Sequence, residues 1–389
     1  MKYTILSIML CTICLFISCA EEKDNAFGDY KSVNIKIDPE NITEPLEFNQ
    51  CTIDSVCPIS LPDSINNFLP TKLMLKNNKI YLLDSEIAKT ILVFNLNGTY
   101  LYKLGERGRA NDEYIGGPTD FFVDDYGIVY VFDARAQQIK IFKENGHFNG
   151  NLGVGDYFIY SFGLLNNKRL LYSIASTNEN EEDKAALISC DLISDDPKKL
   201  LDFKENYTFW PSRFTFFSNE NRLSHIPLLS DSVIVFKGDS LEKIVHFDFD
   251  GKFMRTEKPE LVTHSGSLKD IIDYNGVQDL RKYQETESLI LLEYSYKNLA
   301  MIWFYNKRTK QTWNLNNLFE VGTLIPTLTY LRDNQIIALI EQEDVDLYQD
   351  LLKNPSEEFK KNLAKTPSQV RDVLEGRIKT PVLFYITVK

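Results

Sequence analysis

The sequence has 389 residues, with 55 Asp and Glu against 43 Lys and Arg, and a formal net charge of −12. A body this acidic is repelled by phosphate backbones, and because the chain holds no basic run to offset that repulsion, nucleic acid is not expected as a partner. The length fits either two average domains or one large all-β domain, and 25 Phe with 20 Tyr supply ample material for a core.

The first 18 residues have the features of an export signal. Lys2 gives a positive charge, residues 4–17 form an apolar run that is short for a membrane span, and Ser18 precedes Cys19. The stretch 15–19 resembles a bacterial lipobox, which implies cleavage before Cys19 and attachment of lipid to it. We therefore expect a signal peptide over 1–18 and a membrane anchor at Cys19; an ordinary secreted protein and an uncleaved anchor are the alternatives.

Residues 19–50 are expected to form a lipidated tether and an N-terminal extension, with a peripheral strand over 33–37. Three cysteines follow the leader and Cys19. Cys51 and Cys57 either form one bridge or stay as buried free thiols, and Cys190 is left over. The cysteines and the four histidines lack the spacing of a zinc site, so no metal site is predicted from them.

The clearest pattern lies in residues 99–142, where strands alternate with short turns. The strands are predicted over 99–104, 119–124, 128–132 and 138–142, as one antiparallel meander. The same pattern precedes it, because residues 80–84 align with 129–133 and residues 93–98 with 141–146. A repeated four-strand unit of this kind is typical of a β-propeller blade.

The remaining strands extend this pattern to the end of the chain. Six blades are predicted, and a seventh is left open because the inner strand of blade five, near 276–283, is weakly marked. The predicted strands are 72–75 in blade one; 158–165, 169–174, 185–191 and 198–203 in blade three; 223–229, 232–236, 242–248 and 252–255 in blade four; 289–294, 300–305 and 311–315 in blade five; and 326–331, 335–340 and 382–388 in blade six.

The last blade is one strand short, so it would leave unpaired backbone groups at an open seam. Residues 54–61 form a short apolar strand whose Pro58 suits an outermost position. We expect this strand to complete blade six and close the ring. Residues 344–378 have helical spacing instead and are predicted to form two or three short helices between the second and third strands of that blade.

Three stretches carry a family resemblance. The repeat unit resembles an NHL-type blade, the loop LGERGRANDEY at 104–114 resembles the Gly-rich loop of six-bladed propeller lipoproteins of Bacteroidota, and Thr380–Tyr385 resembles the ending of the same proteins. The acidic residues 20–24 resemble the surface-export signal of that phylum. The resemblance implies an all-β, six-bladed NHL-like or TolB-like propeller over 51–389, anchored to the outer membrane and exposed at the cell surface.

Blade topology groups the connections on two faces. Those joining strand one to two and three to four are short, whereas the long ones, 106–117, 177–184, 205–222, 256–275 and the helical insertion, all belong to the opposite face. Elaborate loops on a rigid scaffold commonly bind partners. We expect the long-loop face to hold a glycan, a peptide or an envelope protein.

Two of these loops offer candidate ligand-binding residues. Arg107, Arg109, Glu113 and Tyr114 share one loop, where guanidinium groups suit carboxylates or sugar hydroxyls; the alternative is that the arginines pair with Asp112 and Glu113 and join neighbouring blades. Trp210 and Arg213 lie in an aromatic loop that either stacks a sugar ring or packs over a small core.

The sequence contains no recognisable catalytic motif. Residues 177–183 could ligate calcium, but they lack the order of a calcium loop, and the sequence favours a solvated acidic tip instead. No cofactor is therefore assigned. Asp84 and Asp133 are expected to accept hydrogen bonds from turn amides. The sequence favours a non-catalytic binding or scaffolding propeller; the alternatives are a propeller hydrolase or lyase with an axial metal, and an architectural protein whose helical insertion docks a partner.

Overall fold

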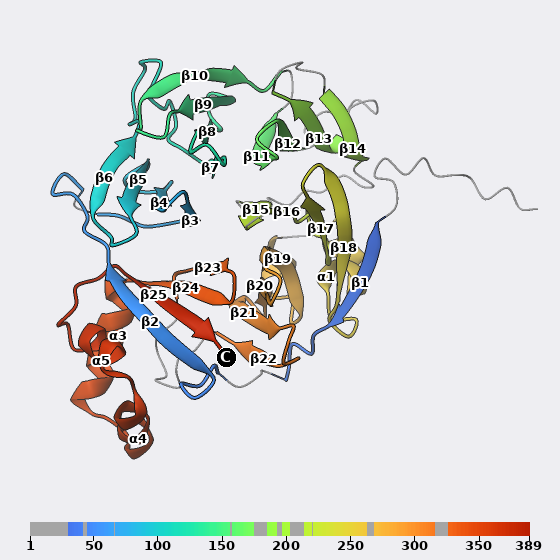
Figure 1. Cartoon of the computed structure of the whole chain (residues 1–389). Helices are drawn as coiled ribbons and strands as arrows, with labels where there is room; N and C mark the ends of the chain where they lie inside the picture. The colour runs from blue at the N-terminus through green and yellow to red at the C-terminus, as the bar shows by residue number, and fades with distance from the viewer. Residues whose placement is uncertain are drawn as a thin grey trace, which may run out of the picture.

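The computed structural model describes residues 30–41, 45–65, 67–155, 158–174, 185–192, 197–202, 214–219, 221–262, 268–315 and 326–389. The strands in these residues form six sheets arranged around a central axis, as the view along that axis in Figure 1 shows. Five sheets have four strands, and the sheet of blade four has a fifth. The predicted six-bladed β-propeller is confirmed.

Blades one to three are built from consecutive strands, the first at the axis and the last at the rim (Figure 1). Blade one contains β3 (Lys72–Lys76), β4 (Lys79–Asp84), β5 (Thr90–Asn95) and β6 (Tyr100–Leu104). Blade two contains β7 (Asp120–Val123), β8 (Val129–Asp133), β9 (Gln138–Phe142) and β10 (Phe148–Gly153). Blade three contains β11 (Ile159–Leu165), β12 (Arg169–Ile174), β13 (Ala185–Asp191) and β14 (Pro197–Asp202).

Blades four to six include the N-terminal segment at their rims. Blade four contains β15 (Phe216–Asn219), β16 (Arg222–His225), β17 (Ser232–Lys237), β18 (Ser240–Asp248) and, outermost, β1 (Lys31–Lys36). Blade five contains β19 (Val277–Glu285), β20 (Leu289–Tyr296), β21 (Leu299–Asn306) and β22 (Thr312–Asn314). Blade six contains β23 (Leu328–Arg332), β24 (Gln335–Ile340), β25 (Val382–Val388) and β2 (Cys51–Pro58).

Two strand assignments made from the sequence are wrong. Residues 99–104 do not join the meander of 119–142: β6 pairs with β5 in blade one, and the fourth strand of blade two is β10. In blade four, the inner strand is β15, so the predicted first strand is the second, and the predicted outer strand over 252–255 runs into a helix. Phe253 and Met254 are buried there, and in the sequence such apolar residues look like those of a buried strand.

The ring is closed by the two ends of the chain, as predicted. β2 pairs antiparallel with β25, from Cys51 opposite Val388 to Pro58 opposite Val382, three residues earlier in the chain than expected. Cys51 and Cys57 are buried free thiols, so the second alternative for them holds. Burial raises the pKa of Cys51 to about 12 and that of Cys57 to about 11, which keeps both thiols protonated.

Residues 31–41 and 45–58 form a strap along the rim, which begins with β1 and ends with β2. β1 pairs in parallel with β18 of blade four, Pro45 makes an isolated bridge to Asn314 of blade five, and β2 completes blade six. Figure 1 shows this strap in blue across the outer edges of the three blades. The predicted peripheral strand is therefore part of a longer clamp.

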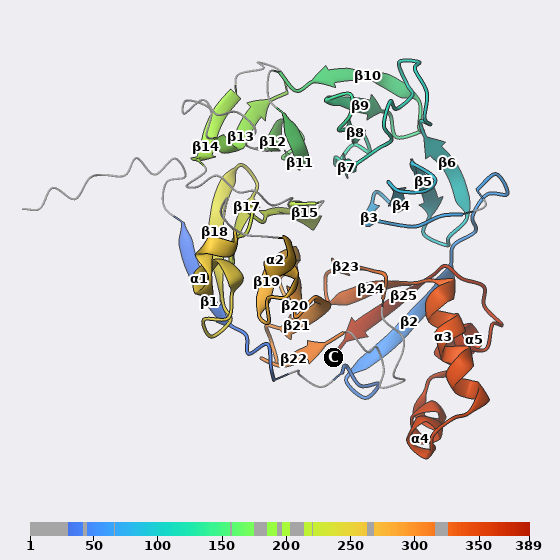
Figure 2. The same cartoon turned by 180° about the vertical axis from the view of Figure 1, so that it is seen from behind.

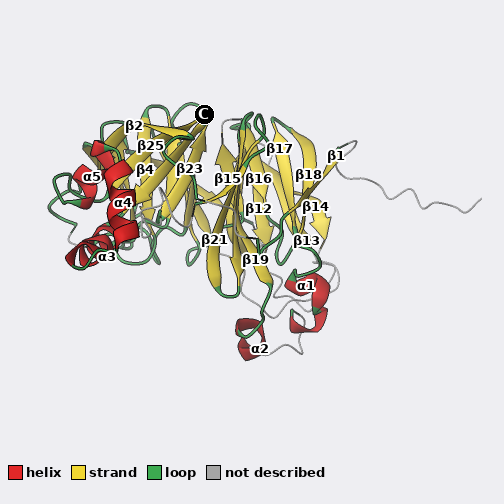
Figure 3. Ribbon diagram, turned by 90° about the horizontal axis from the view of Figure 1, so that it is seen from below, coloured by secondary structure: helices red, strands yellow, loops and turns green. Residues whose placement is uncertain are grey.

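Helices lie outside the ring. Those between blades four and five, α1 (Met254–Glu257), the 3₁₀ helix Pro259–Leu261 and α2 (Leu268–Ile272), project from one face of the disc, and the C-terminus lies at the opposite face (Figure 3). The predicted insertion consists of α3 (Gln342–Lys353), α4 (Glu357–Lys365) and α5 (Ser368–Leu374) at the rim of blade six (Figure 2). None of the helices in the described part of the chain is both long and apolar enough to cross a membrane.

The aspartates expected to cap turns do so. Asp84 accepts hydrogen bonds from the backbone N–H of Leu69 at 2.7 Å and from its own turn, and Asp133 accepts them from Ile115 at 2.6 Å and from its own turn. Both carboxylates are fully buried. Each one therefore ties the incoming connection of its blade to the turn that follows the second strand.

Polar contacts near the axis join every blade to the next. Lys72 Nζ of blade one lies 2.5 Å from Asp120 Oδ1 of blade two, and Ser161 Oγ of blade three donates to Asp120 Oδ2 at 3.0 Å. The other contacts run from Thr215 N to Ser161 Oγ (3.4 Å), Ser224 Oγ to Tyr283 O (2.9 Å), Leu331 N to Gln284 Oε1 (3.1 Å) and Tyr330 OH to Leu75 O (3.4 Å).

The seam between blades six and one predicts a position that tolerates only glycine. Gly98 has φ +81°, and a Cβ there would lie 1.9 Å from the carbonyl oxygen of Pro58 in β2. Gly251 has a similar φ of +78° but open space around it. Gly251→Ala should therefore lose about 1–2 kcal/mol of unfolding free energy from backbone strain alone, and Gly98→Ala about 1–3 kcal/mol more because β2 must move. Urea unfolding of both variants measures the difference; equal losses would contradict the close contact at the seam.

Candidate functional site

A cavity of about 340 Å³ lies on the axis, at the face where the first strand of each blade turns into the second. Its lining comes from the ends of the inner strands β3, β7, β11, β15 and β23 and from the turns after them. Five of the six blades therefore contribute to it. The cavity is on the short-turn face, opposite the long-loop face where we expected binding; much of the long-loop face lies outside the described residues, so that prediction stays a prediction.

The cavity has an apolar floor and a polar rim. The floor is made of buried strand residues: Met74, Leu75, Phe122, Val123, Leu165, Leu223 and Tyr330. The rim is rich in amides from three blades: Asn77, Asn78, Asn166, Asn167, Asn219 and Asn221. Carboxamide side chains both donate and accept hydrogen bonds, so the rim suits a polar ligand with an apolar face.

Two rim side chains are buried and keep hydrogen-bonding groups unused. Asn219 ends β15 and is 3% exposed, and neither its Oδ1 nor its Nδ2 has a partner in the described structure. Arg222 begins β16 and is 7% exposed, and its Nη1 is likewise without a partner. Asn219 and Arg222 face each other in the β15–β16 register. Buried polar groups are nearly always satisfied, so these three atoms single out Asn219 and Arg222 as candidate ligand contacts.

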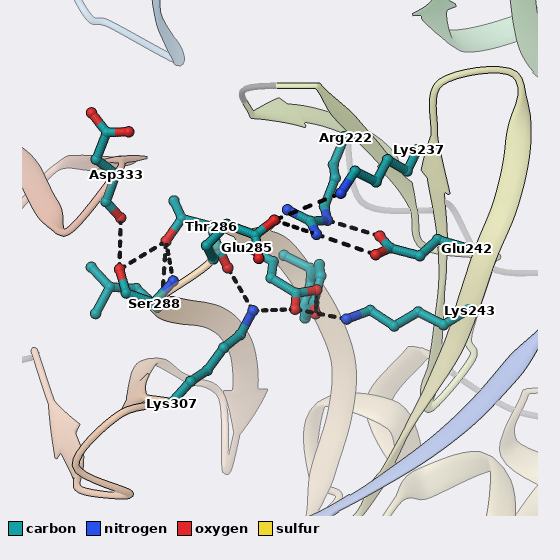
Figure 4. A network of polar contacts seen from close by, with 12 residues as sticks. Arg222, Lys237, Glu242, Lys243, Glu285, Thr286, Ser288, Lys307 and Asp333 are labelled. Atoms are coloured by element: carbon teal, nitrogen blue, oxygen red, sulfur yellow. Dashed lines mark hydrogen bonds and ion pairs between the residues drawn. The ribbon is translucent and has the colours of Figure 1, made fainter.

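A network of ion pairs fixes Arg222 in place. Its Nε donates to Glu242 Oε2 and its Nη2 to Glu287 Oε1, both at 2.8 Å (Figure 4). Because these two carboxylates hold one edge of the planar guanidinium, the free Nη1 has a fixed direction. The hydrogen bonds that Arg222 donates to Glu242 and to Glu287 raise its pKa further above the ordinary value, despite its burial.

Glu285, at the end of β19, lies in the middle of the same network and is 3% exposed. Its carboxylate accepts hydrogen bonds from Lys243 at 2.7 Å, from Lys307 and from the hydroxyl of Tyr283 at 2.6 Å (Figure 4). Burial alone would raise the pKa of Glu285, but the bonds and charges of the two lysines outweigh it, so the pKa lies below its ordinary value. The network therefore joins blades four and five beside the cavity through a buried anion.

The charges of the lining are largely paired. Lys76 lies 2.5 Å from Asp125, whose second oxygen accepts from Asn167 at 2.9 Å. Arg332 donates to Gln335 and its guanidinium lies 5.7 Å from the ring centre of Tyr385. Asp125 is the sole carboxylate among the described lining residues, so a bare cation finds little to hold it there.

The other end of the axis holds a buried carboxylate, Asp120. Asp120 is fully buried, and it is paired with Lys72 and hydrogen-bonded to Ser161. Lys72 Nζ also lies 3.8 Å from the ring centre of Phe122. Within the described residues, no group of three or more His, Cys, Asp or Glu side chains is placed to hold a metal ion. Asp120 thus serves the contact between blades.

The ligand-binding residues predicted from the sequence lie elsewhere. Arg107 and Arg109 are exposed in the connection between blades one and two. Glu113 accepts a hydrogen bond from Ala110 N at 2.8 Å, and Tyr114 is fully buried, with its hydroxyl donating to Leu104 O at 2.8 Å. The loop thus holds its own shape through Glu113 and Tyr114 and leaves its arginines at the surface. Trp210, Arg213 and the lipidation residue Cys19 lie outside the described residues.

One sequence pattern, paired asparagines after inner strands, does correspond to the axial cavity. Paired asparagines occupy the turn after the inner strand in blade one, Asn77 and Asn78, and again in blade three, Asn166 and Asn167, all with positive φ. Asparagine is common at such turns for backbone reasons alone. In the sequence, turns that line a cavity look the same as ordinary turns. The difference appears only in the folded ring, which brings these asparagines to one axis.

Comparisons with known proteins agree on the fold. The family described as "Domain of unknown function (DUF4934)" matches residues 32–370. A Bacteroides fragilis protein described as exported superimposes with a TM-score of 0.73 at 16% identity, covering 92% of this chain and 100% of its own. No curated protein matches.

Two further solved structures are more distant. A DUF4221 family member from Bacteroides vulgatus has a TM-score of 0.48 at 13% identity, covering 87% of this chain and 97% of its own. Virginiamycin B lyase from Staphylococcus aureus has a TM-score of 0.40 at 11% identity, covering 73% and 80%. Likeness at this level carries no argument about function.

The network beside the cavity predicts a pH-dependent stability. Because the pKa of Glu285 is lowered in the folded state, its contribution is present above the ordinary value of 4.5 and is lost as the pH falls through the folded value. Glu285→Gln should lower the unfolding free energy by about 1.5–3 kcal/mol at pH 7, and the difference should shrink as the pH falls below 4.5 and through the folded value.

Urea unfolding at pH 7, 5 and 3 measures this difference. Glu357→Gln is the control, because that carboxylate on α4 is 91% exposed and should leave the stability unchanged at each pH. A Glu285→Gln protein as stable as the wild type at pH 7 would show that the buried anion does not hold blades four and five together.

Proposed function

The chain belongs to the DUF4934 family, described as a domain of unknown function, and from the geometry of its axial cavity we propose that it is a lipid-anchored binding protein of the cell envelope. It holds a small ligand at the short-turn mouth of the propeller without transforming it. The observation that carries the proposal is the pair of buried polar side chains, Asn219 and Arg222, which belong to the cavity lining and keep hydrogen-bonding groups without partners.

The free-energy cost of unpaired buried polar groups supports a ligand in the axial cavity. A buried polar group without a partner destabilises a protein by about 1–3 kcal/mol, and binding partners remove that penalty. The cavity volume of about 340 Å³ lies at the lower end of the range for small-molecule sites, which is about 300–1,000 Å³. Its lining from five blades is rigid, because each contributing strand is hydrogen-bonded within a sheet. A preformed site of this kind needs little reorganisation to bind.

The chemistry of the lining favours binding over catalysis by an axial metal. Its polar groups are mainly amides, together with cations that are already hydrogen-bonded. Asp125, the carboxylate of the described lining, is bound by Lys76 and Asn167 and is not free to act as a base or a metal ligand. The hydrolase or lyase alternative therefore has less support than a binding role.

The cell-envelope location rests on the start of the chain and on one neighbour. Residues 15–19 resemble a lipobox, and the Bacteroides fragilis protein of the same fold is described as exported. In this proposal the acyl chains on Cys19 hold the propeller at the outer membrane, with the acidic residues after it acting as a spacer at the cell surface.

Anchoring predicts that Cys19 decides where the protein is found. Cys19→Ala should move the protein from the membrane fraction to the soluble fraction or the medium, because no acyl chain remains to hold it. Cys190→Ala is the control, since this buried thiol lies in blade three, and its protein should stay with the membranes. Immunoblots of separated fractions distinguish the outcomes, and membrane retention of the Cys19→Ala protein would exclude the lipid anchor.

Binding in the axial cavity predicts that a bulky rim residue blocks it. Asn221 is exposed at the mouth, so Asn221→Trp should cover the cavity without disturbing the core. We expect at least one member of a panel of monosaccharides, tripeptides and small organic acids to raise the melting temperature of the full chain saturably, and this shift should vanish in Asn221→Trp.

The matched control is Asn354→Trp, at an exposed position in the helical insertion far from the axis, which should keep the shift. A panel without any saturable effect, or an equal shift in Asn221→Trp, would refute the cavity as the binding site.

A further inference from the structure

We infer that the ligand of the axial cavity is a sugar ring, bound through its hydroxyl groups by Asn219 and Arg222. This inference rests on the proposed function and names its ligand class. It starts from two side chains of the cavity lining that keep groups without partners: one acceptor and one NH₂ donor on Asn219, and the donor Nη1 on Arg222.

The combination of groups on Asn219 favours hydroxyls. A hydroxyl group donates one hydrogen bond and accepts others, so two neighbouring hydroxyls of a pyranose satisfy both ends of a carboxamide at once. A carboxylate or phosphate only accepts, and it would leave Asn219 Oδ1 buried and unpaired. Asn219 therefore selects against simple anions.

The charge of Arg222 leads to the same conclusion. Glu242 and Glu287 each lie 2.8 Å from the guanidinium, so its positive charge is already compensated within the protein. What Arg222 still offers is a directed N–H donor rather than net charge. A neutral hydroxyl accepts such a bond without adding a third anion to the network of Glu242, Glu285 and Glu287.

The remaining surfaces of the cavity fit the two sides of a sugar. The exposed amides of Asn78, Asn166 and Asn221 stand at the mouth, where further hydroxyls would lie. The floor, with Phe122, Leu165 and Tyr330 among its members, is apolar and suits the C–H face of the ring.

A peptide has no comparable fit in this cavity. Peptides are commonly bound along an exposed sheet edge, as a helix in a groove or as an extended proline-rich segment on aromatic side chains. The axial cavity is closed around by five blades and presents strand ends rather than a strand edge. A compact ring fits such a space better than an extended chain.

Isothermal titration of the purified full chain tests the inference. The sugar probes are glucose, galactose, mannose, N-acetylglucosamine and glucuronate, each as the free sugar and as its methyl glycoside; the other probes are trialanine and inorganic phosphate. We expect saturable binding of at least one sugar. If a methyl glycoside binds as tightly as the free sugar or more tightly, the ligand is the terminal ring of a glycan. If the free sugar binds more tightly than its methyl glycoside, the ligand is a free monosaccharide.

Asn219→Leu should weaken that binding about tenfold or more, because two hydrogen bonds to the ligand are lost. The same change should leave the melting temperature of the unliganded protein unchanged or higher, since it replaces an unpaired buried amide with an apolar group of similar size. Asn354→Leu, at an exposed site, should leave the affinity unchanged. If Asn219→Leu fails to fold by circular dichroism, Asn221→Trp takes its place.

Sugar binding that survives these rim and cavity variants would overturn the inference, as would tighter binding of phosphate or trialanine. If a peptide or an organic acid binds and Asn221→Trp abolishes that binding, the cavity is still a binding site and only the sugar assignment is wrong. If no probe binds in the titration or in the melting-temperature panel, both the sugar assignment and the proposed function are wrong.

Discussion

The pairing of β2 with β25 is the constraint on which the rest of the structure depends. It joins residues near position 51 to residues near position 388 and completes the sheet of blade six. Without this pairing the last blade would have an open edge, and the contacts from blade six to blade one at Leu75 and Gly98 would have no fixed partner. The axial cavity exists only in the closed ring, because β23 of blade six and β3 of blade one form adjacent parts of its wall.

The closed ring also explains why polar residues can be buried at the axis. Inner strands from neighbouring blades converge there, and several polar side chains find a partner on the next blade, as Lys72 does with Asp120 and Ser224 with Tyr283. A buried ion pair of this kind adds little to stability compared with apolar packing, but it favours one arrangement of the blades over others. Asn219 and Arg222 keep unused groups beside these contacts, as Thr215 Oγ1 does, and they are the two that belong to the cavity lining.

Much of the fold could be predicted from the sequence because it depends on local signals. Alternating apolar residues marked most strands, the aspartates at 84 and 133 marked the repeat, and the missing strand of blade six pointed to the N-terminal segment. The strands of blade four could not be assigned correctly from the sequence, because β15 has only four residues and the apolar pair Phe253 and Met254 resembles part of a strand. The site could not be read because its residues are turn formers whose meeting at one axis is a property of the ring.

The strap along the rim sets the order in which backbone pairings would meet a force applied at the N-terminus. A force applied at the N-terminus meets the six-residue parallel ladder between β1 and β18 first, then the bridge from Pro45 to Asn314, and only then the strand that closes the ring. Peeling must therefore begin on blade four, at a distance from the seam. The ladder between β1 and β18 therefore stands between a load at the N-terminus and the strand that closes the ring.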